Sequence, residues 1–97
     1  MDVLNAIAKV RFNSARPQRV QLYKCADFLC ELLCLEPGQD LTASGRCVYY
    51  LVAGTGEIKS GKTQETATLG HLVTCDDGES HTIVNTSEQR LICLAVS

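Results

Sequence analysis

The sequence predicts a single all-β domain, a sandwich or a barrel, in a chain of 97 residues. Short runs rich in β-branched and aromatic residues recur every ~8–12 residues, with turn residues between them. No helical pattern of roughly 10–15 residues separates the runs, which excludes βαβ units. The length fits one domain, and 45% hydrophobic with 21% charged residues is ordinary for a globular chain.

A helix or arm over residues 1–18 is predicted to precede a barrel domain of residues 19–97. Val3, Ile7 and Val10 fall at helical spacing, and the Asn, Ser and Pro residues that follow end the pattern. The sequence leaves open whether this segment is a helix, a swapped strand or a loose arm.

The strands of the barrel are predicted from alternation, from apolar runs and from turn residues. Residues 19–25 alternate like a half-buried strand, and residues 28–35 are so apolar that we expect burial on both faces. Residues 47–53 are rich in β-branched and aromatic types and stop at Gly54. The remaining predicted strands are residues 57–60, 62–66, 72–75, 80–86 and 90–96.

Residues 56–63, Gly-Glu-Ile-Lys-Ser-Gly-Lys-Thr, match the phosphate-loop pattern GxxxxGK[ST]. That loop needs a following helix and a crossover to a parallel strand, which together take about a dozen residues or more. Only residues 64–69 lie before the next glycine. We therefore interpret the segment as a hairpin that turns at Gly61, and not as a nucleotide site.

Charge is distributed unevenly along the chain. Residues 1–24 hold five basic residues against Asp2 alone, whereas the rest of the chain holds four basic and ten acidic residues. Nucleic-acid binding, ordinary solvation and docking on an acidic partner subunit are the three interpretations. The basic residues are scattered with few aromatics among them, so no nucleic-acid partner is expected. No apolar run approaches the ~20 residues of a membrane span, so no membrane partner is expected either.

None of the six cysteines forms a CxxC motif, which excludes zinc-ribbon and thioredoxin-like sites. Most lie in apolar runs, which favours buried free thiols in a reducing cytoplasm, with a disulfide framework as the alternative. The chain also starts without the pattern of a signal peptide, so a cytoplasmic location is expected. The cysteines are Cys25, Cys30, Cys34, Cys47, Cys75 and Cys93.

Residues 70–85 resemble the second motif of the cupin superfamily, G(x)5PxG(x)2H(x)3N. Gly70, Gly78, His81 and Asn85 match in register, with Asp76 at the position of the usual proline. Upstream, the segment from Pro37-Gly38 to Gly54 is similar to the glycine ends of the first cupin motif, G(x)5HxH(x)3-4E(x)6G. The resemblance covers about residues 19–96.

This resemblance implies a small jelly-roll barrel, the double-stranded β-helix, that is usually a homodimer. It also implies a cavity inside the barrel, which in the family often holds a divalent transition metal through two or three histidines and a glutamate. Imidazole and carboxylate suit such metals, and a barrel mouth is a natural pocket.

The chain departs from the family at the metal ligands. Counted back from Gly54, the glutamate position falls on Cys47, and no register places a histidine at either HxH position. Of the family's ligands only His81 remains, so no cofactor is predicted and a divalent transition metal is kept as the alternative. The registers considered for the HxH pair are Leu41 with Ala43, Asp40 with Thr42, and Ser44 with Arg46. Cys47, Asp40 and Asp76 are possible additional ligands, without a spacing that defines a site.

A metal-free pocket is then predicted to be lined by Cys47, Tyr49, His81 and Ile83, because alternate residues of a strand share one face. His81 is the candidate for catalysis, since the reference pKa of ~6.5 for histidine suits a general acid or base. A structural histidine in a packed barrel is the alternative. Cys47 would be a nucleophile only if it contacted His81.

Three functions are compatible with these patterns. The first is a metal-free protein that binds a small molecule or serves as an accessory protein. The second is a metal-dependent cupin enzyme, an oxygenase or isomerase, with an unorthodox site around His81. The third is a structural dimeric module in which the basic segment of residues 1–24 lies on the acidic body of a second subunit.

Overall fold

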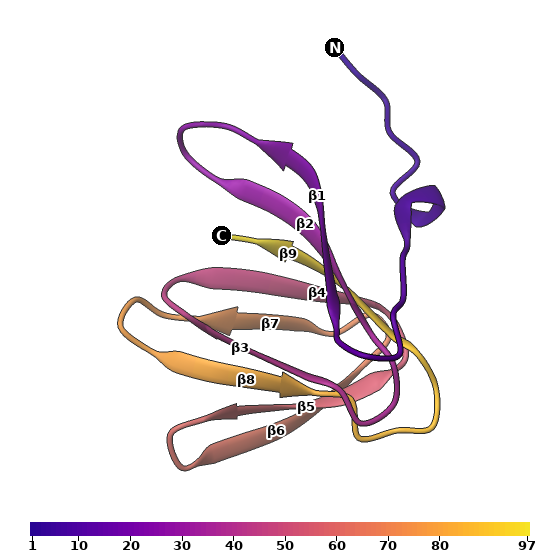
Figure 1. The fold of residues 1–97 in the computed structure, drawn as a ribbon. Helices are drawn as coiled ribbons and strands as arrows, with labels where there is room; N and C mark the ends of the chain where they lie inside the picture. Colours follow the sequence, from indigo (N-terminus) through magenta and orange to yellow (C-terminus); the bar gives the residue numbers. More distant parts are fainter.

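Nine strands in two facing antiparallel sheets make up the barrel in the computed structural model, which describes residues 1–97 (Figure 1). The five-stranded sheet has the order β1 (Gln18–Lys24), β2 (Leu29–Leu35), β9 (Leu91–Val96), β4 (Cys47–Ala53), β7 (Leu72–Cys75). The four-stranded sheet has the order β3 (Asp40–Ser44), β8 (Ser80–Val84), β5 (Thr55–Ser60), β6 (Thr63–Thr68). The all-β class and the jelly-roll barrel predicted from the sequence are confirmed.

The core fills the space between the two sheets, and it is built from every second residue of each strand. In β4, Cys47, Tyr49 and Leu51 are buried, whereas Val48 and Tyr50 are exposed on the outer face. This period of two is the geometry of a pleated strand with one face in the core. The complete core cluster is Leu33, Leu35, Cys47, Tyr49, Leu51, Ile58, Ala67, Cys75, Ile83, Leu91, Cys93 and Ala95.

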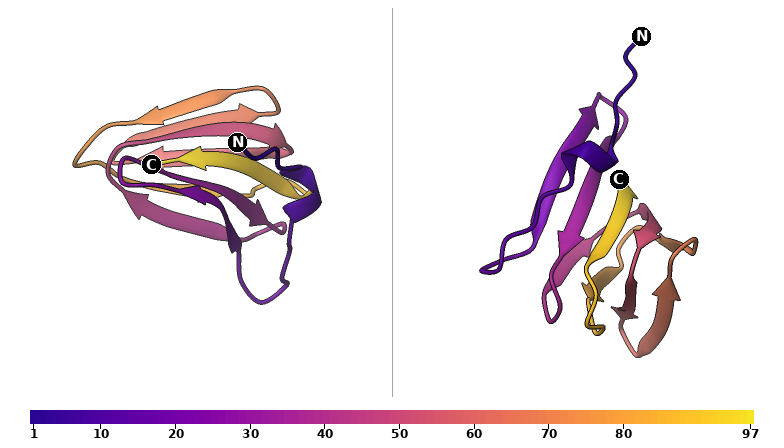
Figure 2. Two further views of the ribbon diagram at one scale, coloured as in Figure 1. Left: turned by 90° about the horizontal axis from the view of Figure 1, so that it is seen from above. Right: turned by 90° about the vertical axis from the view of Figure 1, so that its right-hand side faces the viewer.

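Strand β2 is buried on both faces, as its apolar composition predicts. Leu33 and Leu35 belong to the core cluster, while Leu32 and Cys34 alternate with them and are equally buried. Burial of that second face requires a cover outside the barrel, and the N-terminal arm runs beside β1 and β2 (Figure 2).

Of the alternatives left open for the N-terminal segment, the structure has an arm, with one 3-10 turn, η1 (Ile7–Lys9). The Ala8 amide of this turn donates a 3.3 Å hydrogen bond to Asn5 Oδ1, but an isolated single turn is too short for a stable α-helix. The arm is attached to the barrel by contacts of its side chains and backbone. The Arg90 guanidinium lies 4.4 Å from the centre of the Phe12 ring, and Gln39 Nε2 donates a 2.7 Å hydrogen bond to the Asn13 carbonyl.

Strand β3 is absent from the sequence-based prediction. Its residues, Asp-Leu-Thr-Ala-Ser, are mostly polar and exposed, and the strand exists because it pairs with β8 along its whole length. Tertiary pairing therefore outweighs the weak local preference of these residues for a strand.

The GxxxxGK[ST] segment forms the β5–β6 hairpin, as predicted. Ser60 pairs with Thr63 across a two-residue turn, and Gly61 has the positive φ that such turns require. The structure contains no helix that could cross a membrane.

Candidate functional site

Three strands bring four reactive side chains together inside the barrel, and we call them the thiol–imidazole cluster: Cys47, Tyr49, Cys75 and His81. Cys47 and Tyr49 come from β4, Cys75 from β7 and His81 from β8. Cys47 and Cys75 are direct cross-strand partners. All four side chains are buried.

His81 lies at the centre of this cluster. Its Nε2 is 2.6 Å from the Tyr49 hydroxyl and 3.4 Å from Cys47 Sγ. The Tyr49 and His81 rings meet edge to face, with centroids 5.4 Å apart. The other ring nitrogen, Nδ1, is buried without a hydrogen-bond partner. Two groups therefore compete for one nitrogen of His81, while its second nitrogen has none.

Burial keeps the Tyr49 hydroxyl and the Cys75 thiol protonated. Loss of solvent raises the pKa of Tyr49 well above its usual value, and the nearby Cys47 raises it further. The pKa of Cys75 is raised to about 11, first by burial and then by Cys47 and the carboxylates of Glu79 and Asp76. A thiol that stays protonated at neutral pH is a poor nucleophile, so the environment of Cys75 does not favour covalent catalysis.

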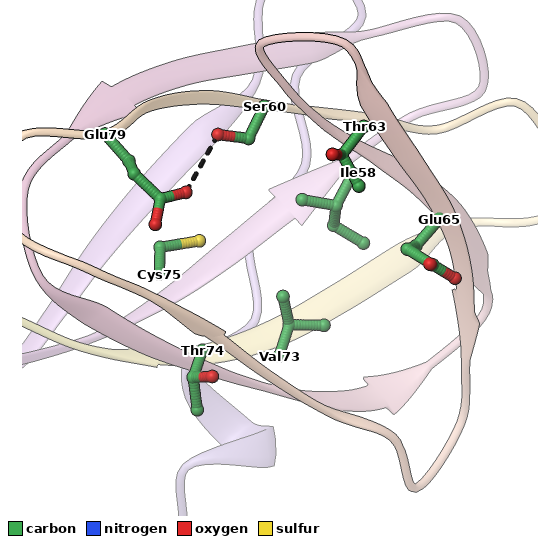
Figure 3. A pocket seen from close by; sticks show the side chains of 8 residues that line it. All are labelled: Ile58, Ser60, Thr63, Glu65, Val73, Thr74, Cys75 and Glu79. Atoms are coloured by element: carbon green, nitrogen blue, oxygen red, sulfur yellow. Dashed lines mark hydrogen bonds between the residues drawn. The ribbon is translucent and has the colours of Figure 1, made fainter.

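A pocket of about 210 Å³ opens beside this cluster, between the β5–β6 hairpin and β7 (Figure 3). These elements are at the edges of the two sheets, where no ladder of hydrogen bonds closes the barrel. Ser60 donates a 3.0 Å hydrogen bond to Glu79 across one end of the pocket. Its lining residues are Ile58, Ser60, Thr63, Glu65, Val73, Thr74, Cys75 and Glu79.

Of the four residues predicted to line a pocket, Cys47, Tyr49 and His81 are in contact with one another, and Ile83 is buried in the core on the same strand as His81. None of the four lines the pocket of Figure 3. Cys75 connects the two, because it lines the pocket and belongs to the cluster. The sequence patterns did not select Cys75, since its pairing with Cys47 depends on the register of two distant strands.

The metal site of the cupin family does not fit this chain. Leu41 and Ala43 occupy β3 opposite Ile83 and His81, where no imidazole is available. The other two registers do not fit either, because their residues are all exposed: Asp40, Thr42, Ser44 and Arg46. The donors that do converge are two thiols and one imidazole, namely Cys47, Cys75 and His81, whose ligand atoms all lie within 4.8 Å of one another.

The two facing sheets and their order define the double-stranded β-helix, so the chain has the fold of the cupin superfamily. Solved structures agree. The protein TT1209 from Thermus thermophilus superposes with a TM-score of 0.93 at 21% identity, over 99% of this chain and 95% of that one. A conserved protein with a double-stranded β-helix domain from Klebsiella pneumoniae superposes with a TM-score of 0.89 at 18% identity, over 99% and 88% of the two chains.

An RmlC-like cupin protein from Desulfovibrio desulfuricans is also similar, with a TM-score of 0.82 and 19% identity over 98% of this chain and 95% of that one. No family model and no curated protein matches the chain. At these identities the likeness establishes the fold, and the function has to be argued from the site.

Proposed function

We propose that this protein binds a small organic cation, such as an amine or a guanidine, in the pocket between the β5–β6 hairpin and β7. The observation that carries this proposal is the charge of the pocket. Glu65 and Glu79 line it, whereas none of its lining residues is basic. Carboxylates that face a partly enclosed space attract cations, because the low-dielectric walls strengthen their field.

The rest of the lining sets the size and shape of the expected ligand. Ser60, Thr63 and Thr74 offer hydroxyl groups, and Ile58 and Val73 provide apolar walls. A volume of about 210 Å³ is below the roughly 300–1,000 Å³ of pockets for drug-sized ligands. We therefore expect a small metabolite with one cationic group and a short apolar part.

A binding screen with matched compounds tests this function. Small amines should bind, and neutral alcohols of the same shape should bind at least about tenfold more weakly, because a charge-assisted hydrogen bond contributes about 1.5–3 kcal/mol. The measurement is a titration followed by NMR. Glu79→Gln should weaken amine binding about tenfold or more, whereas Glu88→Gln, which changes an exposed loop carboxylate, should not. Equal binding of amines and alcohols would contradict the proposal.

We also propose that the protein is a homodimer, and an exposed apolar patch favours this. Tyr50 and Leu72 are direct partners on the outer face of β4 and β7, and Val48 is on the same face. They are 43%, 63% and 37% exposed, respectively. Contiguous exposed apolar side chains are a feature of protein–protein interfaces.

Light scattering of the purified protein tests the dimer. Wild type should have the mass of two chains, and Tyr50→Glu combined with Leu72→Glu should have the mass of one, since both changes place charge on the patch. Thr66→Glu, on the exposed part of β6, is the control and should leave the mass unchanged. A monomeric wild type would exclude this assembly.

We propose a reducing compartment, the cytoplasm, as the location. All six cysteines are free in the structure. The support is chemical, since reduced thiols persist where glutathione and thioredoxin act. Cells are denatured directly in an alkylating reagent, and the number of modified cysteines in the protein is then counted by mass spectrometry. All six cysteines should be modified, and a smaller number would argue for an oxidising compartment.

A further inference from the structure

We propose that Cys47, Cys75 and His81 bind one thiophilic divalent ion, with Zn²⁺ as its representative. This inference goes beyond binding of an organic cation, and it does not depend on that function. It differs from the cupin metal site in its donors, because two sulfur atoms replace the nitrogen and oxygen ligands.

The distances match a tetrahedral site. Zn–S bonds of about 2.3 Å and Zn–N bonds of about 2.0 Å place the two ligand atoms about 3.5 Å apart at the tetrahedral angle. Cys47 Sγ and His81 Nε2 are 3.4 Å apart. Cys75 Sγ is within 4.8 Å of the other two ligand atoms, so a small shift of one side chain would complete the triad.

Charge balance favours a dication at this buried position. Burying an uncompensated charge costs several kcal/mol or more, so a buried ion needs ligands of opposite charge. Two thiolates and a neutral imidazole around a dication carry no net charge. Thiolate and imidazole together are also the ligands that Zn²⁺ prefers over the harder metals.

The environment of His81 is unusual for an imidazole that only fills the core. Such a side chain would normally satisfy both ring nitrogens. Here Cys47 Sγ and Tyr49 Oη both crowd Nε2, and Nδ1 has no partner although His81 is only 2% exposed. Two sulfur atoms and an imidazole nitrogen that lie within 4.8 Å of one another can each supply a lone pair to one ion.

Ions can reach the triad from the pocket. Cys75 lines that pocket together with Glu79, and Figure 3 shows the two side chains at the same end of it. The carboxylates of Glu65 and Glu79 attract a cation toward this opening. Three protein ligands also leave a fourth position open, as in zinc sites that accept water or a substrate.

Titration of the reduced protein with Co²⁺, a spectroscopic substitute for Zn²⁺, tests the inference. The wild type should bind one equivalent and show the near-ultraviolet absorption of a Co–thiolate bond, and Zn²⁺ should then displace the Co²⁺ and remove the band. The experiment uses a non-thiol reductant and oxygen-free buffer, so that both thiols stay available. Saturation with Zn²⁺ should also raise the melting temperature, because the ion binds only the folded chain.

Variants assign the band to the triad. Cys75→Ser should reduce the Co–thiolate absorption by about half and weaken binding at least tenfold, and His81→Ala should weaken binding by a similar factor. Cys25→Ser, which changes a thiol outside the cluster, is the matched control and should bind like the wild type. Circular dichroism is used to check that each variant is folded. If His81→Ala does not fold, Cys75→Ser by itself tests the inference.

Two results would overturn the inference: no Co–thiolate band in the reduced wild type, or an unchanged band in folded Cys75→Ser. Its failure is distinguishable from failure of the proposed function. A protein that binds amines but no metal retains the pocket function and loses the metal site. A protein that binds Co²⁺ but no amine has the metal site and lacks the pocket function.

Discussion

Asn85 holds one corner of the barrel through its side-chain amide. Its Nδ2 donates hydrogen bonds to the carbonyls of Leu35 and Gln89, at 3.0 and 2.7 Å. Its Oδ1 accepts bonds from the Ser87 backbone amide and hydroxyl, at 3.1 and 2.9 Å. Both amide hydrogens and both lone pairs are thus used, in a side chain that is completely buried. The asparagine of the motif is a structural residue here, at the end of a strand.

We predict that Asn85→Ala lowers the free energy of unfolding by about 3 kcal/mol, because it removes all four hydrogen bonds of a completely buried side chain. Urea unfolding at equilibrium measures the effect. Ser87→Ala removes one hydroxyl from the same loop and should cost only about 1 kcal/mol. Equal losses in the two variants would show that the amide is not the anchor.

At the scale of elements, the corner between β4 and β5 carries the chain from one sheet to the other. Gly54 occupies this corner with a φ of +85°, which favours glycine. A Cβ atom at Gly54 would lie 2.4 Å from the Arg90 carbonyl oxygen, which belongs to the backbone leading into β9. The glycine is therefore required twice, by its conformation and by the close approach of another segment.

Gly54→Ala should lower the free energy of unfolding by about 3 kcal/mol or more, since backbone strain of about 1–3 kcal/mol adds to a clash that the chain cannot relieve by rotating a side chain. The control is Gly61→Ala in the β5–β6 hairpin. Its φ is also positive, but nothing lies within 4 Å of the added Cβ, so only the strain of about 1 kcal/mol remains. Thermal unfolding of both variants compares the two, and similar melting temperatures would contradict the role of the close contact.

At the scale of the whole molecule, buried thiols make the free energy of unfolding decrease as the pH becomes alkaline. Cys93 is fully buried on β9, and burial raises the pKa of its thiol to about 12. The unfolded chain then loses this proton near pH ~8.5, before the folded chain does. Because the folded state holds the proton more tightly, the contribution of Cys93 is complete below that pH and declines as the pH rises toward about 12.

We predict that the free energy of unfolding of the reduced wild type falls by about 1.4 kcal/mol per pH unit for this thiol above pH ~8.5. Cys93→Ala should be less stable at neutral pH. Its free energy of unfolding should decline less steeply with pH, because one proton fewer is released on unfolding. Urea unfolding between pH 8 and about 10.5 measures the slopes. Leu94→Ala, on the same strand, loses packing but no titrating group, and its decline should match the wild type. A Cys93→Ala slope equal to that of wild type would disprove the linkage.

The role of the N-terminal arm is also decided at the scale of the whole molecule, because the arm can cover its own barrel or a second subunit. In the structure it lies beside β1 and β2 of its own barrel (Figure 2), and its Arg11 is a direct neighbour of the buried Cys34. Docking of the basic segment on a second subunit stays a prediction. The contacts of Phe12 and Asn13 with the barrel show where the arm is held.

Deletion of residues 1–16 should lower the free energy of unfolding by several kcal/mol, since it exposes apolar side chains worth about 1.5–3 kcal/mol each. Deletion of residues 1–4, which are exposed, should have little effect. Urea unfolding and light scattering of both variants separate the roles of the arm. If the longer deletion leaves the stability unchanged but halves the mass, the arm serves the second subunit and not its own barrel.

Local patterns determined much of the fold of this protein. The alternation in residues 47–53 predicted which side chains of β4 enter the core, and it placed Cys47 and Tyr49 on one face. The two-residue turn at Gly61 and the bend at Gly54 were likewise visible from local residue types. These features depend on the pleat and on φ, which neighbouring residues decide.

Only the tertiary structure decided what depends on register between distant strands. β3 exists because it pairs with β8, and Cys75 joins Cys47 and His81 because β7 pairs with β4. A shift of one residue in either pairing would turn these side chains to the other face, and no local pattern specifies that choice. Most of the strands and the inner face of β4 thus follow from the sequence alone, whereas β3, the thiol–imidazole cluster and the pocket beside it follow from how the two sheets pair and close on each other.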